Sequence, residues 1–86
     1  MPVYEILLSK TSRKQLKIFP AFVHNNIIEE ITNLSTNPRP AGCIKLKGYK
    51  NSYRIRVGDY RVIYEIEDKM LRILVIAIGH RKDIYK

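Results

Sequence analysis

The 86-residue chain has little of what would place a protein in a membrane or outside a cell. It has one cysteine, Cys43, which excludes an internal disulfide, makes a cysteine-based metal cluster implausible and predicts a small packed residue. No apolar run is long enough to span a bilayer, and the first ten residues, which include Glu5, are too short for a signal peptide. We therefore expect a reduced, cytoplasmic setting, with no membrane partner, metal or cofactor.

Acidic residues are also scarce. The chain has 16 Lys and Arg residues against 8 Asp and Glu residues, a formal net charge of +8. A domain this small and this basic is expected to meet a polyanion, and nucleic acid is one candidate. The positive charge is concentrated between residues 45 and 61, where only one acid, Asp59, occurs. Six residues there are candidates for RNA binding: Lys45, Lys47, Lys50, Arg54, Arg56 and Arg61.

The chain length and the absence of repeats predict one domain, residues 1–86. Residues 3–8 are expected to form a strand, followed by a helix from Lys10 to about Phe19, with Ser9 or Thr11 as its N-cap. Pro20 ends this helix and begins the next one. An apolar stripe of Val23, Ile27, Ile31 and Leu34 marks the second helix, which ends at "STNPRP".

The segment "YRIRVGDYRVIY", residues 53–64, predicts a hairpin whose tight turn is Gly58-Asp59. This turn places Arg56 opposite Arg61, on a face that also carries Arg54, while tyrosines and aliphatic residues form the other face. Like charges placed directly opposite each other destabilise a sheet. Each arginine alone is better explained as a solvated strand residue, but the paired cluster indicates a binding site for an anion such as a phosphodiester.

Two further strand segments complete the predicted sheet. A short edge extension is expected at residues 44–47, and a central strand at residues 71–78. A loop at residues 67–70 would pair Glu65 with Arg72 and bring Gly79 level with Gly58. The predicted fold class is α+β, a small antiparallel sheet with a helical hairpin packed on one face, in the order β-α-α-β-β-β. Arg81, His80 and Tyr85 of the tail would then converge with the arginines on the uncovered face.

Such a cluster has a specific chemical use. RNA cleavage by its own 2′-hydroxyl needs a proton acceptor, a proton donor and positive charge on the five-coordinate phosphate, and it needs no metal. Arginine supplies the charge, whereas it is never neutral enough to be a base. His80 could perform either proton transfer. Tyr85 could act as a base beside the arginines, because positive charge favours a phenolate, or it could stack on an unpaired nucleotide. The residues leave open which of the two is the base.

The segment "YRIRVGDYRVIYEI", with the apolar strand after it, the tail "IGHRKDIY", the preceding "KLKG" and the "NP" that ends the helical hairpin, resembles the RelE toxins of the RelE/ParE superfamily. The resemblance covers nearly the whole chain. It implies a RelE-like fold and a type II toxin that cuts mRNA in the ribosomal A site and inhibits translation. It also implies a cognate antitoxin that wraps and silences the toxin, and a toxin–antitoxin pair that represses its own operon, with operator DNA bound through the antitoxin. The basic face of the sheet predicts that the antitoxin is anionic where the two proteins meet.

The resemblance also implies site roles. Arg61 and Arg81 would hold and neutralise the scissile phosphate, and Tyr85 would stack on or deprotonate the nucleotide. Arg54 and Arg56 stand where the best-known members have lysines, so these two are expected to act by charge alone. His80 is the alternative proton-transfer group. Two rival functions remain open at this point: a ParE-type inhibitor of DNA gyrase with the same fold, and a non-catalytic basic module that binds nucleic acid.

Overall fold

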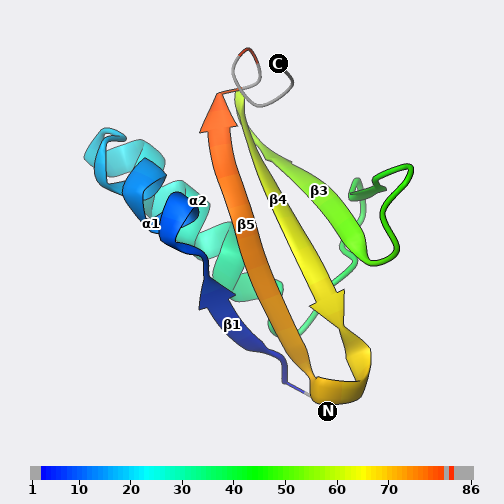
Figure 1. Cartoon of the computed structure of the whole chain (residues 1–86). Helices are drawn as coiled ribbons and strands as arrows, with labels where there is room; N and C mark the ends of the chain where they lie inside the picture. Colours follow the sequence, from blue (N-terminus) through cyan, green and yellow to red (C-terminus); the bar gives the residue numbers. More distant parts are fainter. Residues whose placement is uncertain (1–2, 81, 83–86) are drawn as a thin grey trace.

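In the computed structural model, which describes residues 3–80 and Lys82, two helices cover one face of a five-stranded sheet (Figure 1). Spatially, the strands run in the order β1-β5-β4-β3-β2. The elements are β1 (Glu5–Leu8), α1 (Lys10–Lys17), α2 (Ala21–Asn33), β2 (Ile44–Lys45), β3 (Ser52–Val57), β4 (Tyr60–Glu67), a 3₁₀ turn (Asp68–Met70) and β5 (Arg72–His80). The predicted α+β class and element order are confirmed.

The sheet is mixed rather than wholly antiparallel. Strands β2 to β5 are antiparallel neighbours as predicted, but β1 pairs in parallel with β5, with Glu5 beside Arg72 and Leu8 beside Val75. The chain leaves β1 through both helices and enters the sheet again at the opposite edge. Strand β5 therefore lies between β1 and β4, in the sheet interior, which explains its nearly continuous apolar sequence.

The helices begin and end close to the expected residues. Ser9 is the N-cap of α1, and its hydroxyl accepts the Ser12 N–H at 3.0 Å. Pro20 is the N-cap of α2, which ends at Asn33, ahead of the predicted proline-containing stop. The stripe of α2 packs on the sheet, with Ile27, Ile31 and the C-cap residue Leu34 buried. Neither of the described helices is long and apolar enough to cross a membrane.

The β3–β4 hairpin has the predicted register throughout. Val57 faces Tyr60, Ile55 faces Val62, and Arg56 faces Arg61. Gly58 has a φ of +62°, a conformation that glycine adopts at little cost and that two-residue hairpins require. The predicted register between β4 and β5, which placed Glu65 opposite Arg72, is wrong. Strand β4 continues through Glu67, which pairs with Arg72, and the loop is completed by Leu71 at a φ of +50°.

A bulge in β5 shifts the pairing again. Tyr64 faces Val75 whereas Ile63 faces Ala77, so Ile76 has no residue opposite it on β4. Strand β1 pairs with β5 only as far as Val75. At and just beyond that point, side chains of Ser9 and the first turn of α1 bind the backbone of the bulge. Ser9 donates its hydroxyl to the Ile76 carbonyl at 2.7 Å, and the buried Ser12 hydroxyl donates to the Val75 carbonyl at 3.2 Å. Gly79 therefore lies opposite Arg61, and not level with Gly58 as predicted.

Candidate functional site

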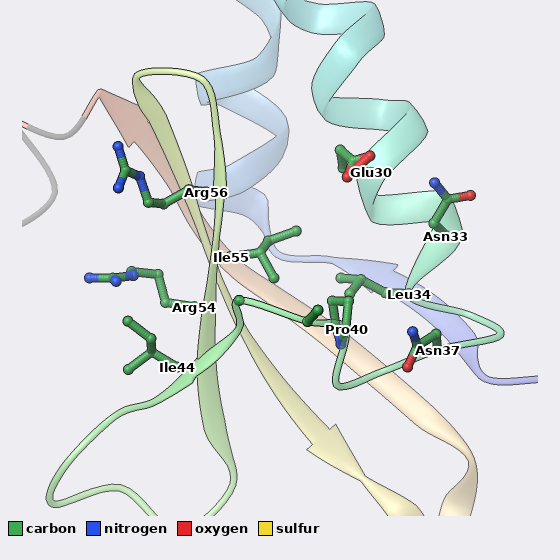
Figure 2. A pocket seen from close by; sticks show the side chains of 11 residues that line it. Glu30, Asn33, Leu34, Asn37, Pro40, Ile44, Arg54, Ile55 and Arg56 are labelled. Atoms are coloured by element: carbon green, nitrogen blue, oxygen red, sulfur yellow. The ribbon is translucent and has the colours of Figure 1, made fainter.

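The sheet face turned away from α1 and α2, here called the open face, carries the three hairpin arginines. Figure 2 shows Arg54 and Arg56 pointing away from α2, whereas Ile55 between them points toward the helices. Arg61 of β4 lies directly opposite Arg56 and shares its face. The Arg56 side chain is exposed, and Arg54 and Arg61 are half-buried. The structure thus places all three arginines together, as the hairpin pattern predicts.

The three lysines expected beside the arginines do not share one location. Lys45 lies opposite Tyr53, so strand alternation assigns it to the helix side of the sheet. Lys47 lines a hollow on the open face, and Lys50 is exposed in the loop that leads to β3. Only Lys47 therefore extends the arginine cluster along the open face. Lys45 and Lys50 extend the positive charge around the β2 edge of the sheet.

His80 does not join the arginines on the open face. It faces Tyr60 across the β4–β5 pair, with the ring centroids 5.6 Å apart and the rings edge to face. Tyr60 in turn contacts Phe19, at 4.9 Å between centroids, so this aromatic group lies on the helix side. The cause is the bulge at Ile76, which adds one residue to β5 and reverses the face of every residue after it.

The His80 ring still touches the tail. Its Nδ1 accepts the N–H of Lys82 at 3.2 Å. This hydrogen bond links the His80 side chain to the backbone two residues farther along the chain. The two other predicted tail residues of the site, Arg81 and Tyr85, lie outside the residues that the structure describes.

At the far end of the sheet, a polar cluster that the sequence does not reveal joins four segments. Asp68 accepts hydrogen bonds from Arg39 Nη2 at 2.8 Å and from the Tyr4 hydroxyl at 2.6 Å. Arg39 also donates to the Tyr53 hydroxyl at 3.1 Å, and its guanidinium carbon lies 5.1 Å from the centre of that ring. The Arg39 and Tyr4 donors lower the pKa of Asp68. This cluster lies at the 3₁₀ turn between β4 and β5, so we read it as a structural clamp.

A different hollow lies along the outer edge of β3, between that strand, α2 and the loop at residues 37–42 (Figure 2). It has a volume of about 560 Å³ and exists because β2 pairs only with Tyr53 and Arg54 and stops there. Among the described residues, no group of three or more His, Cys, Asp or Glu side chains is arranged to hold a metal ion. The open face offers positive charge through the guanidinium groups of Arg54, Arg56 and Arg61.

Comparison with known proteins identifies the family. Residues 6–85 match the family model described as the ParE toxin of the type II toxin–antitoxin system parDE. The curated protein "Toxin RelE3" of Methanocaldococcus jannaschii is 40% identical over 85 residues, which are 94% of each chain. This chain belongs to the RelE/ParE superfamily. It is a RelE-type toxin of a type II toxin–antitoxin system.

Solved structures agree with the assignment to the RelE type. The toxin in the archaeal RelE–RelB complex from Pyrococcus horikoshii OT3 is 30% identical, with a TM-score of 0.83 over 94% of this chain and 98% of that one. The RelB–RelE antitoxin–toxin complex from Methanococcus jannaschii gives 33% identity and a TM-score of 0.76, over 93% and 95% of the chains. The RelE-like fold that the sequence resemblance implies is therefore confirmed.

Proposed function

We propose that this RelE-type toxin is a ribosome-dependent endonuclease that cuts mRNA in the ribosomal A site and so inhibits translation. The observation that supports this most directly is the pairing of Arg56 with Arg61 on the open face. Two guanidinium groups opposite each other concentrate positive charge at one place, and a phosphodiester accepts hydrogen bonds from such paired N–H donors. Their shared place on the open face supports a phosphate ligand.

In the proposed reaction the 2′-hydroxyl oxygen of the message attacks the adjacent phosphorus. A base takes the 2′ proton, the bond from phosphorus to the 5′ oxygen breaks, and an acid protonates that oxygen, leaving a 2′,3′-cyclic phosphate. Arg61 and Arg81 bind the phosphate and neutralise the charge that develops on it, and Arg54 and Arg56 add charge alone. No metal or cofactor enters the step.

We assign the proton acceptor to Tyr85, which also stacks on the nucleotide. His80 is the weaker candidate, because it lies on the helix side with its Nδ1 accepting the N–H of Lys82. We assign it a positioning role, in which it directs the tail that carries Arg81 and Tyr85. Lys47 and Lys50, together with Lys45 at the sheet edge, attract the RNA backbone.

The positive charge of the open face also bears on the protein partner of the toxin. We propose a cognate antitoxin with an anionic, amphipathic segment that covers the open face, since the structural neighbours from Pyrococcus horikoshii and Methanococcus jannaschii are complexes with the antitoxin RelB. Operator DNA would be bound through that antitoxin. The ribosome and its message are the targets of the free toxin.

The test is to add the purified chain to ribosomes translating a defined message and to map the new mRNA 5′ ends. We expect cuts inside codons that occupy the A site, and no cuts without ribosomes. Arg61→Ala should reduce them by about 10²- to 10³-fold, whereas Arg13→Ala, which changes an exposed arginine of α1, is the matched control. Uncut message in the presence of active ribosomes would refute the nuclease.

A second function has one observation in its favour, because the matching family model is the ParE toxin. ParE-type toxins would act on DNA gyrase, so the same protein should be added to a gyrase supercoiling reaction. Inhibition of supercoiling that Arg61→Ala does not relieve, together with intact message, would favour this alternative.

A further inference from the structure

The open face has a second feature beside its arginines. A hollow of about 400 Å³ lies on it toward the β4–β5 loop, within the size range of small-ligand sites. Its walls combine apolar and polar side chains from the loop before β3 and from β3, β4 and β5. They are Leu46, Tyr49, Ile63 and Ile76, with Lys47, Ser52 and Glu65.

The apolar floor of this hollow is a product of the β5 bulge. Val75 and Ile78 are both buried against the helices, so the two residues between them, Ile76 and Ala77, remain for the open face. On the open face, Ile76 lines the same hollow as Ile63. Tyr49 borders them with 65% of its surface exposed. Aliphatic and aromatic surface gathered on a cationic face indicates a ligand that is itself partly flat and apolar.

The spacing from the arginines identifies that ligand. Ile63 follows Arg61 by two residues on β4, a rise of about 7 Å at about 3.4 Å per residue, and both lie on the open face. Arg54 lies directly opposite Ile63. A phosphate bound by the arginines therefore leaves its own nucleotide within reach of the hollow. An unpaired nucleobase fits both the apolar floor and an exposed tyrosine on which it can stack.

One polar group in the hollow can distinguish the bases. Glu65 lies opposite Ser52 and is half-buried. An ionised carboxylate only accepts hydrogen bonds. Adenine, cytosine and guanine each carry an amino group that can donate to it, whereas uracil has no amino group and its one donor at that edge, N3–H, lies between two carbonyl oxygens. Those oxygens would face the negative charge.

We propose that this hollow is a nucleobase subsite, in which Ile63, Ile76 and Tyr49 hold one unpaired base of the message and Glu65 selects bases with an amino group over uracil. The inference rests on the proposed function, because it takes RNA as the substrate. It names a substrate-selecting residue, Glu65, outside the arginine cluster.

The test is a titration of the isotope-labelled full chain with GMP, AMP, CMP and UMP, followed by NMR at the isoleucine methyl groups. We expect the Ile63 and Ile76 signals to shift with all four nucleotides and UMP to bind at least about threefold more weakly. Glu65→Gln, whose amide offers a donor as well as an acceptor, should reduce that difference to less than about twofold. Glu67→Gln, farther along the same strand and outside the hollow, is the control and should leave it unchanged.

Two results would overturn the subsite. One is shifts confined to the arginines, with the Ile63 and Ile76 methyl groups unmoved. The other is base selectivity that Glu65→Gln does not change. Because the titration needs neither ribosomes nor cleavage, base-selective shifts with uncut message would refute the nuclease and retain the subsite. An Ile63→Ser variant that binds all four nucleotides normally, but loses a purified antitoxin, would assign the hollow to the antitoxin instead.

Discussion

Arg56 on β3 and Arg61 on β4 lie directly opposite each other, so both side chains share the sheet face turned away from the helices. Neighbouring positions on the other face are occupied by the core residues Ile55 and Val62, which are buried. Successive side chains of the hairpin therefore lie on opposite faces of the sheet, and the two faces differ in function. One face stabilises the fold through apolar packing, and the other presents positively charged side chains.

Replacing Arg61 should separate activity from stability. Arg61→Ala removes a phosphate ligand, and we expect mRNA cleavage to fall by about 10²- to 10³-fold, as for loss of one group that stabilises transition-state charge. The same change relieves repulsion with Arg56, so the free energy of unfolding should change by no more than about 0.5 kcal/mol. Cleavage on ribosomes and urea denaturation measure the two quantities. Cutting at the parent rate would remove Arg61 from the site.

The pH dependence of cleavage should identify the proton acceptor. With Tyr85 as the base, single-turnover cleavage rises with pH, and Tyr85→Phe lowers the rate and flattens that rise while keeping the stacking ring. His80→Gln should lower the rate at all pH values and keep the shape of the profile, because His80 contacts Tyr60 and the Lys82 N–H on the helix side. If Tyr85→Phe instead cuts as fast as the parent at every pH, the tyrosine is not the base.

Asp68 should make stability fall in acid. Its hydrogen bonds from Arg39 and Tyr4 lower its folded-state pKa below the ordinary value of 3.8. A depressed carboxyl pKa contributes stability that is present above the unfolded-state pKa and is lost as pH falls through the folded-state pKa. Thermal unfolding from about pH 7 to about pH 2 should therefore show a smaller acid loss in Asp68→Asn than in the parent. Glu29→Gln, an exposed carboxyl of α2, is the control. Equal acid loss in Asp68→Asn and the parent would count against the clamp.

Association with the antitoxin should depend strongly on salt. The net charge of +8 and the arginines of the open face attract an anionic segment before contact is made. We expect the association rate constant, measured by stopped flow with the cognate antitoxin, to fall at least about tenfold between low and high salt. The dissociation rate should change less. An association rate unaffected by salt would contradict an electrostatic encounter with this face.

The sequence by itself determined the local features. Gly58-Asp59 set the β3–β4 register, and with it the pairing of Arg56 with Arg61, because a two-residue turn leaves one way to align its strands. Alternation then assigned every hairpin side chain to a face. The N-cap Ser9 and the apolar stripe of α2 were readable for the same reason, since each depends on neighbours within a turn or two.

Tertiary structure decided what depends on segments far apart in the chain. The parallel pairing of β1 with β5 joins the first and last strands, and no local pattern records it. The bulge at Ile76 depends on Ser9 and Ser12, 67 and 63 residues from the carbonyls to which they donate. That single extra residue moved His80 to the helix side and left Ile76 on the open face. A strand has a period of two, so one inserted residue reverses every side chain that follows it, and the hydrogen bonds from Ser9 and Ser12 to β5 lie at the point of insertion.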